Sequence, residues 1–176
     1  DGPVIQESTH KALENGMSVN LLFEQLKDIR KTVDIPLLLM GYLNPALQYG
    51  MEAFCAQCAK TGIDGVILPD LPLEIYQEEY EGIFRKHAIH NVFLATPQTN
   101  DERYRMLDRH SGGFLYMVSS SSITGAKTGF QAYQQKYFER IKNLDLNLPR
   151  VIGFGISTRE TFQHACKYAN GAIIGS

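Results

Sequence analysis

Six short apolar runs, separated by segments with helical spacing, constrain the fold of this chain most strongly. The runs lie at residues 37–42, 64–70, 91–96, 113–119, 150–155 and 172–175. They lack a regular alternation of polar and apolar side chains, as is typical of strands that are covered on both faces. Strands that alternate with helices pair in parallel through right-handed crossovers. The sequence therefore predicts an α/β protein built from repeated strand–helix units.

The segments between these runs carry the start and stop signals of helices. We expect helices at residues 3–14, 19–29, 50–60, 73–87, 101–110, 132–143 and 158–168. Ser18 is placed to cap the second helix, and Gly16 and Gly62 are placed to end the helices before them. Asn44 and Pro45 are expected to break the first strand.

Two architectures satisfy this alternation, namely a closed eight-stranded barrel and an open doubly wound sheet. The open sheet usually has one dominant glycine-rich turn after its first strand. Here, residues of functional type stand at the ends of many strands: Tyr42, Asp70, Thr96, Tyr116, Gly155 and Gly175. That distribution predicts a (β/α)8 TIM barrel. With six strands, we expect the chain to cover roughly strands 3 to 8 of it, as one partial barrel domain over residues 1–176.

Composition limits the classes of partner. The chain has 44% hydrophobic residues and a formal net charge of −2, which gives no reason to expect nucleic acid or an anionic membrane surface. No apolar run approaches the roughly 20 residues of a membrane span. Three cysteines, an odd number, fit a reducing cytosol, and Cys55 and Cys58 are read as the inner side of a helix.

Glycines that follow apolar runs are the first candidate site. Backbone N–H groups converge on an anion where a buried strand turns into a helix, and glycine lets the anion approach closely. We predict a phosphate site from such turns: Gly125, Gly155, Gly175 and Ser176. The alternative is that these glycines only satisfy the geometry of their turns.

Other candidates have two readings each. Asp1 is either a catalytic carboxylate or a helix cap, and Asp70 either acts in the site or fixes its turn. Tyr42 and Tyr116 either wall an apolar pocket or pack in the core. The small polar residues at 119–129 suit either a mobile lid or an ordinary connection. The histidines are not spaced as metal ligands, so no metal site is predicted.

Several motifs together resemble one family. They are residues 1–6 (Asp-Gly-Pro-Val-Ile-Gln), 39–45 (Leu-Met-Gly-Tyr-Leu-Asn-Pro), 62–66 (Gly-Ile-Asp-Gly-Val), 69–72 (Pro-Asp-Leu-Pro), 123–126 (Ile-Thr-Gly-Ala), 153–157 (Gly-Phe-Gly-Ile-Ser) and 175–176 (Gly-Ser). In this order they resemble the tryptophan synthase α subunit family across essentially the whole chain.

The resemblance implies a barrel that cleaves indole-3-glycerol phosphate to indole and glyceraldehyde 3-phosphate, in tryptophan biosynthesis. It implies that Asp1 is catalytic, that Thr124 is the lid residue orienting it, and that the four phosphate-turn residues hold the phosphate. It also implies an indole pocket lined by Tyr42, Ile67, Leu94, Tyr116 and Phe154. The implied subunit has no cofactor of its own, is cytoplasmic, and pairs with a β subunit that holds pyridoxal phosphate (PLP) in an α2β2 assembly.

Some features depart from the family pattern. The family's general acid is a glutamate on the second barrel strand, upstream of Asp1, and this sequence does not contain it. The serines at 119–122 and the turn at 96–99 (Thr-Pro-Gln-Thr) also differ from the usual residues. Two other functions stay open. One is another phosphate-binding barrel enzyme, of the sugar-phosphate isomerase or indole-3-glycerol-phosphate synthase type, and the other is a non-catalytic activator of the β subunit.

Overall fold

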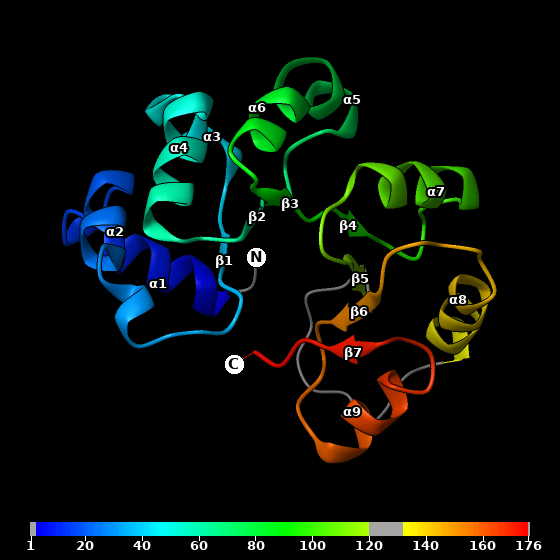
Figure 1. The fold of residues 1–176 in the computed structure, drawn as a ribbon. Helices are drawn as coiled ribbons and strands as arrows, with labels where there is room; N and C mark the ends of the chain where they lie inside the picture. Colours follow the sequence, from blue (N-terminus) through cyan, green and yellow to red (C-terminus); the bar gives the residue numbers. More distant parts are fainter. Residues whose placement is uncertain (1–2, 120–131, 176) are drawn as a thin grey trace. The chain divides into compact units, whose positions relative to one another are not determined.

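The structure, a computed structural model, describes residues 3–119 and 132–175. The chain divides into two compact units, residues 1–91 and 92–176, and each is described here by itself (Figure 1). Asp1, Thr124, Gly125 and Ser176, which the sequence singled out, lie outside the described residues.

The first unit contains three parallel strands and the helices that accompany them. In chain order its elements are α1 (Pro3–Glu14), α2 (Val19–Leu26), a 3₁₀ turn (Ile29–Lys31), β1 (Leu38–Met40), α3 (Leu43–Tyr49), α4 (Met51–Thr61), β2 (Gly65–Ile67), α5 (Leu73–Ile75), a π-helical turn (Tyr76–Tyr80), α6 (Glu81–Lys86) and β3 (His90–Asn91). The strand order is β1-β2-β3. Leu39 is in register with Val66, and Val66 with Asn91.

Local signals explain most of these boundaries. The Ser18 hydroxyl accepts a hydrogen bond from the Leu21 N–H at 3.2 Å, which confirms the predicted cap of α2. Gly62 ends α4 in the left-handed conformation, with φ +83°. The predicted break of the first strand before Asn44 and Pro45 is confirmed, since β1 ends at Met40. Helix α3 at residues 43–49 was not predicted, and Pro45 lies in its first turn, where a missing N–H has no intrahelical role.

The core of the first unit lies between helices and sheet. Phe23 of α2 packs on Phe54 of α4 and on Tyr49 of α3, with ring centroids 5.6 and 5.7 Å apart respectively. Cys55 and Cys58 are fully buried free thiols on α4, so their predicted place on the inner side of a helix is confirmed. Burial raises the pKa of both thiols to about 12, which leaves them uncharged and unreactive near neutral pH.

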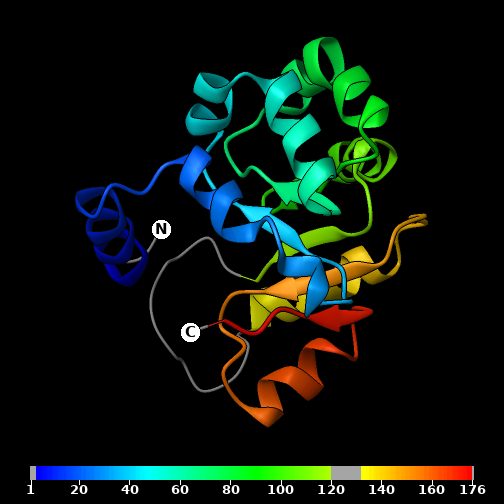
Figure 2. The same cartoon turned by 60° about the vertical axis from the view of Figure 1, so that its left-hand side comes forward.

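The second unit contains four parallel strands and three helices among its described residues. Its elements are β4 (Leu94–Ala95), α7 (Asp101–His110), β5 (Leu115–Val118), α8 (Ala132–Lys142), β6 (Arg150–Gly153), α9 (Arg159–Ala165) and β7 (Gly171–Ala172). The strand order is β4-β5-β6-β7. Figure 2 shows β6 and β7 side by side, with α9 next to β7.

Strand order decides between the two predicted architectures. In both units each strand pairs in parallel with its neighbour in sequence. A doubly wound sheet reverses its strand order at a switch point, whereas a (β/α)8 barrel keeps sequence order. The sequential order within each unit favours the barrel. The apolar run at 91–96 was predicted as one strand but forms the short strands β3 and β4, one in each unit.

Candidate active site

The carboxyl ends of β1 and β2 hold the predicted site residues of the first unit. Tyr42 lies two residues after the end of β1 and directly precedes α3, and its side chain is half exposed. Ile67 is the last residue of β2 and is buried. Tyr42 is therefore available to a ligand in this unit, whereas Ile67 contributes mainly to the core.

Asp70 connects the ends of β1 and β2. Its carboxylate accepts the Leu43 N–H, with oxygens 2.9 and 3.1 Å from the nitrogen. Leu43 is the first residue of α3, and the capping residue Tyr42 makes no side-chain bond to that helix. Asp70 thus supplies the cap of α3 from the neighbouring turn, which favours the turn-fixing role over the catalytic one.

In the second unit, Tyr116, within β5, forms an aromatic pair with Phe154, which directly follows β6. Tyr116 of β5 is in register with Leu94 of β4. The rings of Tyr116 and Phe154 lie 5.7 Å apart and are tilted by 50°. A Cβ atom at Gly153 would overlap the Tyr116 ring and hydroxyl. Glycine at position 153 therefore leaves the space that the Tyr116 side chain occupies beside β6.

The chemical character of this pair is apolar. Tyr116 is 5% exposed, and burial raises the pKa of its phenol to about 12. The phenol stays protonated near neutral pH and is unsuited to act as a base there. Phe154 has 52% of its surface exposed. The pair can therefore provide an apolar wall for a ring-shaped ligand rather than an acid–base group.

The turn after β6 contains Gly155, a predicted phosphate residue. Gly155 has φ +73°, a conformation that favours glycine, although a Cβ there would meet only the Ser119 Oγ at 3.8 Å. Further along, the Ser157 and Thr158 N–H groups both donate to the Thr161 Oγ1, at 3.2 and 3.0 Å. Those two donors are already used within the chain, so a bound anion would rely on earlier N–H groups of the turn.

Gly175 follows β7 and is exposed, and a Cβ atom added there would meet nothing within 4 Å. Crowding therefore does not explain the glycine there, and its role in phosphate binding stays a prediction. A strand was predicted at 172–175, whereas β7 in the structure ends at Ala172. One further bond, from the Ile173 N–H to the Ile152 carbonyl at 2.8 Å, continues the pairing beyond that point.

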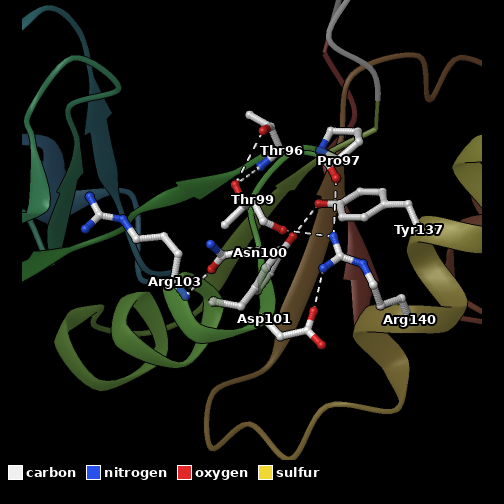
Figure 3. Close-up of polar contacts among 9 residues, drawn as sticks. Thr96, Pro97, Thr99, Asn100, Asp101, Arg103, Tyr137 and Arg140 are labelled. Atoms are coloured by element: carbon white, nitrogen blue, oxygen red, sulfur yellow. Dashed lines mark hydrogen bonds and ion pairs between the residues drawn. The ribbon is translucent and has the colours of Figure 1, made fainter.

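Side chains of helix α8 bind the backbone at the carboxyl end of β4 and in the turn after it. Arg140 donates to the Pro97 and Thr99 carbonyls at 3.3 and 2.9 Å and pairs with Asp101 at 2.5 Å. Figure 3 shows its guanidinium directed at the turn after β4, beside Tyr137. The Tyr137 hydroxyl donates to the Ala95 carbonyl at 3.3 Å, within the same turn region.

The sequence analysis did not single out this support. Gln134, Tyr137 and Arg140 recur at intervals of three and so lie along one side of α8, where Gln134 donates to the Ser119 carbonyl at 2.8 Å. Polar residues at this spacing beside the buried Phe138 and Ile141 were a usable signal. The pattern could have shown a polar stripe, but not the carbonyls that it binds.

Neither a metal-binding cluster nor a membrane-spanning helix is found within residues 3–119 and 132–175. That part of the chain contains no cluster of three or more His, Cys, Asp or Glu side chains that could hold a metal ion. Likewise, none of its helices is both long and apolar enough to cross a lipid bilayer.

Comparisons with known proteins agree on one family. A family model described as "Tryptophan synthase alpha chain" matches residues 1–176. The tryptophan synthase alpha chain of Flavobacterium johnsoniae is 60% identical over 176 residues, which are 100% of this chain and 70% of that protein.

Solved structures give the same result. The tryptophan synthase alpha chain of Legionella pneumophila superimposes with a TM-score of 0.86 at 33% identity, over 99% of this chain and 64% of that one. A chain of the tryptophan synthase complex from Pyrococcus furiosus gives 0.83 at 34% identity, over 99% and 69%. These similarities confirm the predicted fold class, a partial (β/α)8 barrel.

Proposed function

Because the chain belongs to the tryptophan synthase alpha chain family, we propose that it cleaves indole-3-glycerol phosphate to indole and glyceraldehyde 3-phosphate. This is a carbon–carbon lyase reaction of tryptophan biosynthesis. Family membership over the whole chain is the observation that carries the proposal. It also confirms the resemblance that the motifs indicated.

The indole ring is proposed to lie against Tyr116 and Phe154. Their rings, with centroids 5.7 Å apart, contact each other and form an apolar surface, and the half-exposed Phe154 is open to a ligand. The phenol of Tyr116, whose pKa is about 12, stays neutral beside the ring. We assign Leu94 to the same wall, since it is in register with Tyr116. Tyr42 and Ile67 of the first unit, which the resemblance also implies as pocket residues, stay predictions.

Asp1 is proposed to stabilise the charge that develops in the reaction. Protonation of the indole C3 places positive charge on the ring nitrogen. The bond from C3 to the glycerol chain then breaks, its electrons return to the ring, and the hydroxyl on the released carbon loses its proton to become the aldehyde of glyceraldehyde 3-phosphate. A carboxylate that accepts the ring N–H binds more strongly as that charge grows, so it favours the transition state over the substrate. Thr124 is proposed to orient this carboxylate, and Gly125, Gly155, Gly175 and Ser176 to hold the phosphate.

No glutamate of the described residues is assigned as the general acid. Glu7 pairs with Lys11 at 2.7 Å, and Glu14 with His10 at 3.1 Å, all four exposed on α1. Each acid is thus engaged along its own helix and not placed at a strand end. The proposed mechanism takes its C3 proton from a glutamate that this sequence does not contain.

We also propose a partner. One matching structure is described as a tryptophan synthase complex, and we infer that this chain pairs with a β subunit in an α2β2 assembly. That subunit would hold the PLP, while this chain would need no cofactor. We propose docking through residues 44–45, 70–72 and 119–129, and we propose a cytoplasmic location. Size-exclusion chromatography of the intact protein with and without its β subunit tests the pairing, and failure to co-elute would contradict it.

Indole release from indole-3-glycerol phosphate, measured with the intact protein, tests the activity. Asp1→Asn is expected to lower turnover about a hundredfold, the loss typical of one electrostatic contact in a transition state. Asn caps a helix about as well as Asp, so the melting temperature should not change. Near-normal turnover in Asp1→Asn would leave Asp1 as a cap. A parent protein that releases no indole would favour another phosphate-binding barrel or a non-catalytic activator.

A further inference from the structure

The turn after β6 contains a bulky residue in a left-handed conformation. Phe154 has φ +67°, a backbone conformation that residues other than glycine rarely adopt. Its ring is 52% exposed, so burial of the ring does not explain why the backbone stays there. Residues held in this way are maintained by their surroundings and gather at functional sites. Something else in the turn's surroundings must hold Phe154.

Ser119, which directly follows β5, makes the contacts that hold this turn. Its N–H donates to the Gly153 carbonyl at 3.0 Å, and its hydroxyl donates to the Phe154 carbonyl at 2.6 Å. One residue therefore binds two consecutive carbonyls of the turn. Ser119 is 2% exposed, so water does not readily replace it.

Ser119 is in turn held by α8. The Gln134 side chain, 7% exposed, donates through its Nε2 to the Ser119 carbonyl at 2.8 Å. The contacts run from α8 through Ser119 to the backbone of Phe154, whose ring faces Tyr116. The Ser119 hydroxyl and the Gln134 amide both donate to backbone carbonyls next to the aromatic pair.

We propose that Ser119 is a positioning residue for the aromatic wall of the pocket, fixing the left-handed turn at Phe154, and that Gln134 fixes Ser119. This inference rests on the proposed function, in which the Phe154 ring contacts the indole. Loss of the hydroxyl would free the Phe154 carbonyl and let the residue leave φ +67°, so that its ring would move away from Tyr116. The wall binds the indole of substrate and transition state alike, so its loss weakens binding more than turnover.

Steady-state kinetics of the intact protein test this inference. Ser119→Ala is expected to raise the KM for indole-3-glycerol phosphate about tenfold, as for one lost hydrogen bond, with kcat within about twofold of the parent. Ser111→Ala is the matched control, because the Ser111 hydroxyl accepts the Phe93 N–H at 3.0 Å before β4, at the other end of the strands. Ser111→Ala should lower the melting temperature but leave KM unchanged. A parental KM in Ser119→Ala would overturn the inference.

A double-mutant cycle shows whether Ser119 acts through Phe154. Glycine adopts φ +67° without strain, so Phe154→Gly removes both the ring and the need to hold it. In that background, Ser119→Ala should raise KM less than about twofold further, whereas independent residues would give additive effects. Additive effects would mean that Ser119 does not act through the turn. Gln134→Leu is expected to raise KM about threefold by loosening Ser119.

A spectroscopic probe separates this inference from the proposed function. The 176 residues contain no tryptophan, so Phe154→Trp places a reporter where the sequence has no other. Adding Ser119→Ala should change its emission maximum and its quenching by iodide, whereas adding Ser111→Ala should not. An unchanged signal would overturn the positioning role whether or not the protein cleaves indole-3-glycerol phosphate. A parent without cleavage, but with the expected signal change, would contradict only the proposed function.

Discussion

The amino and carboxyl ends of the parallel strands are built differently in both units. At the amino ends, charged side chains bind several backbone groups at once. At the carboxyl ends stand the exposed aromatic residues Tyr42 and Phe154, and the end of β6 also has a left-handed turn and Gly153, which leaves room for the Tyr116 ring. In (β/α)8 barrels the amino-terminal face serves stability and the carboxyl-terminal face serves chemistry. The difference shows the same division of roles at the level of single side chains.

Two acids show how the amino ends are held. Asp64, before β2, accepts the Leu37 N–H at 2.7 Å and pairs with Arg30, which also donates to the Gly62 carbonyl at 2.7 Å. Asp108 of α7, 5% exposed, accepts three N–H groups at 2.9 Å, two from Asn147 and one from the Leu148 backbone. These bonds fix the chain where it enters β1 and where it approaches β6.

The turn after β6 shows the contrast at a carboxyl end. Phe154 is strained and exposed there, and Gly153 is required by the neighbouring ring. Strain of this kind is kept only where the surrounding structure maintains it. A change at an amino end should therefore alter the free energy of unfolding, and a change at a carboxyl end should alter substrate handling. Four substitutions test that contrast.

Asp108→Ala should have the largest effect, and it should act on stability. The substitution removes the acceptor of three N–H groups. We expect this to cost about 3 kcal/mol in the free energy of unfolding, or roughly 10 °C in melting temperature. Asp145→Ala, which removes the same charge from an exposed position in the loop between α8 and β6, should change little. The kcat/KM of Asp108→Ala, measured well below its melting temperature, should match the parent. A loss of activity without a loss of stability would break the contrast.

Gly153→Ala should act on activity at the carboxyl end. The added Cβ displaces the Tyr116 ring, and a shift of about 1 Å near the reacting groups can cost about a hundredfold in rate. Gly171→Ala in β7 is the control, because its Cβ would lie 4.0 Å from the Val151 Cγ1, an ordinary contact. Indole release by both variants provides the measurement. Equal activity in the two would show that the fit of Tyr116 against β6 is unimportant.

Arg140→Met sharpens the contrast, because it removes scaffolding from a carboxyl end. The variant keeps the apolar stem but loses the bonds to the Pro97 and Thr99 carbonyls and to Asp101. We expect about 1.5 kcal/mol of destabilisation together with a few-fold loss of kcat/KM, since the turn after β4 is no longer held. Arg105→Met, on the exposed side of α7, should change neither quantity. An effect on stability alone would place Arg140 with the amino-end group.

Asp64→Asn should have the smallest effect, and that effect should depend on pH. The Leu37 N–H and the Arg30 guanidinium lower the pKa of Asp64 below its usual value. Its contribution is therefore present above the unfolded-state pKa of about 4 and is lost as pH falls through the folded-state pKa. The side chain is 47% exposed, so the difference at pH 7 should stay below about 1 kcal/mol. Urea unfolding at pH 7 and below about pH 4 should show that the difference in the free energy of unfolding between parent and variant shrinks in acid. A difference that grows in acid would contradict this assignment.

The sequence alone predicted the parts of the fold that depend on near neighbours in the chain. Strand–helix alternation, the Ser18 cap and the stop at Gly62 follow from patterns a few residues long, and the structure has all three. Motifs along the chain were enough to indicate the family. The site residues implied by that resemblance stay predictions, and the roles of Asp1, Thr124, Gly125 and Ser176 concern positions outside the described residues.

Only the tertiary structure decided which side chains hold the strand ends. Asp70 could be either catalytic or structural until its bond to Leu43 was seen, 27 positions away in the chain. Ser119 binds Phe154 across 35 positions, and Arg140 binds Thr99 across 41. Such bonds depend on the register of parallel strands and on where a helix packs, and neither is encoded by the spacing of residues near them. A helical period places a side chain on one face, but packing alone selects the carbonyl that it binds.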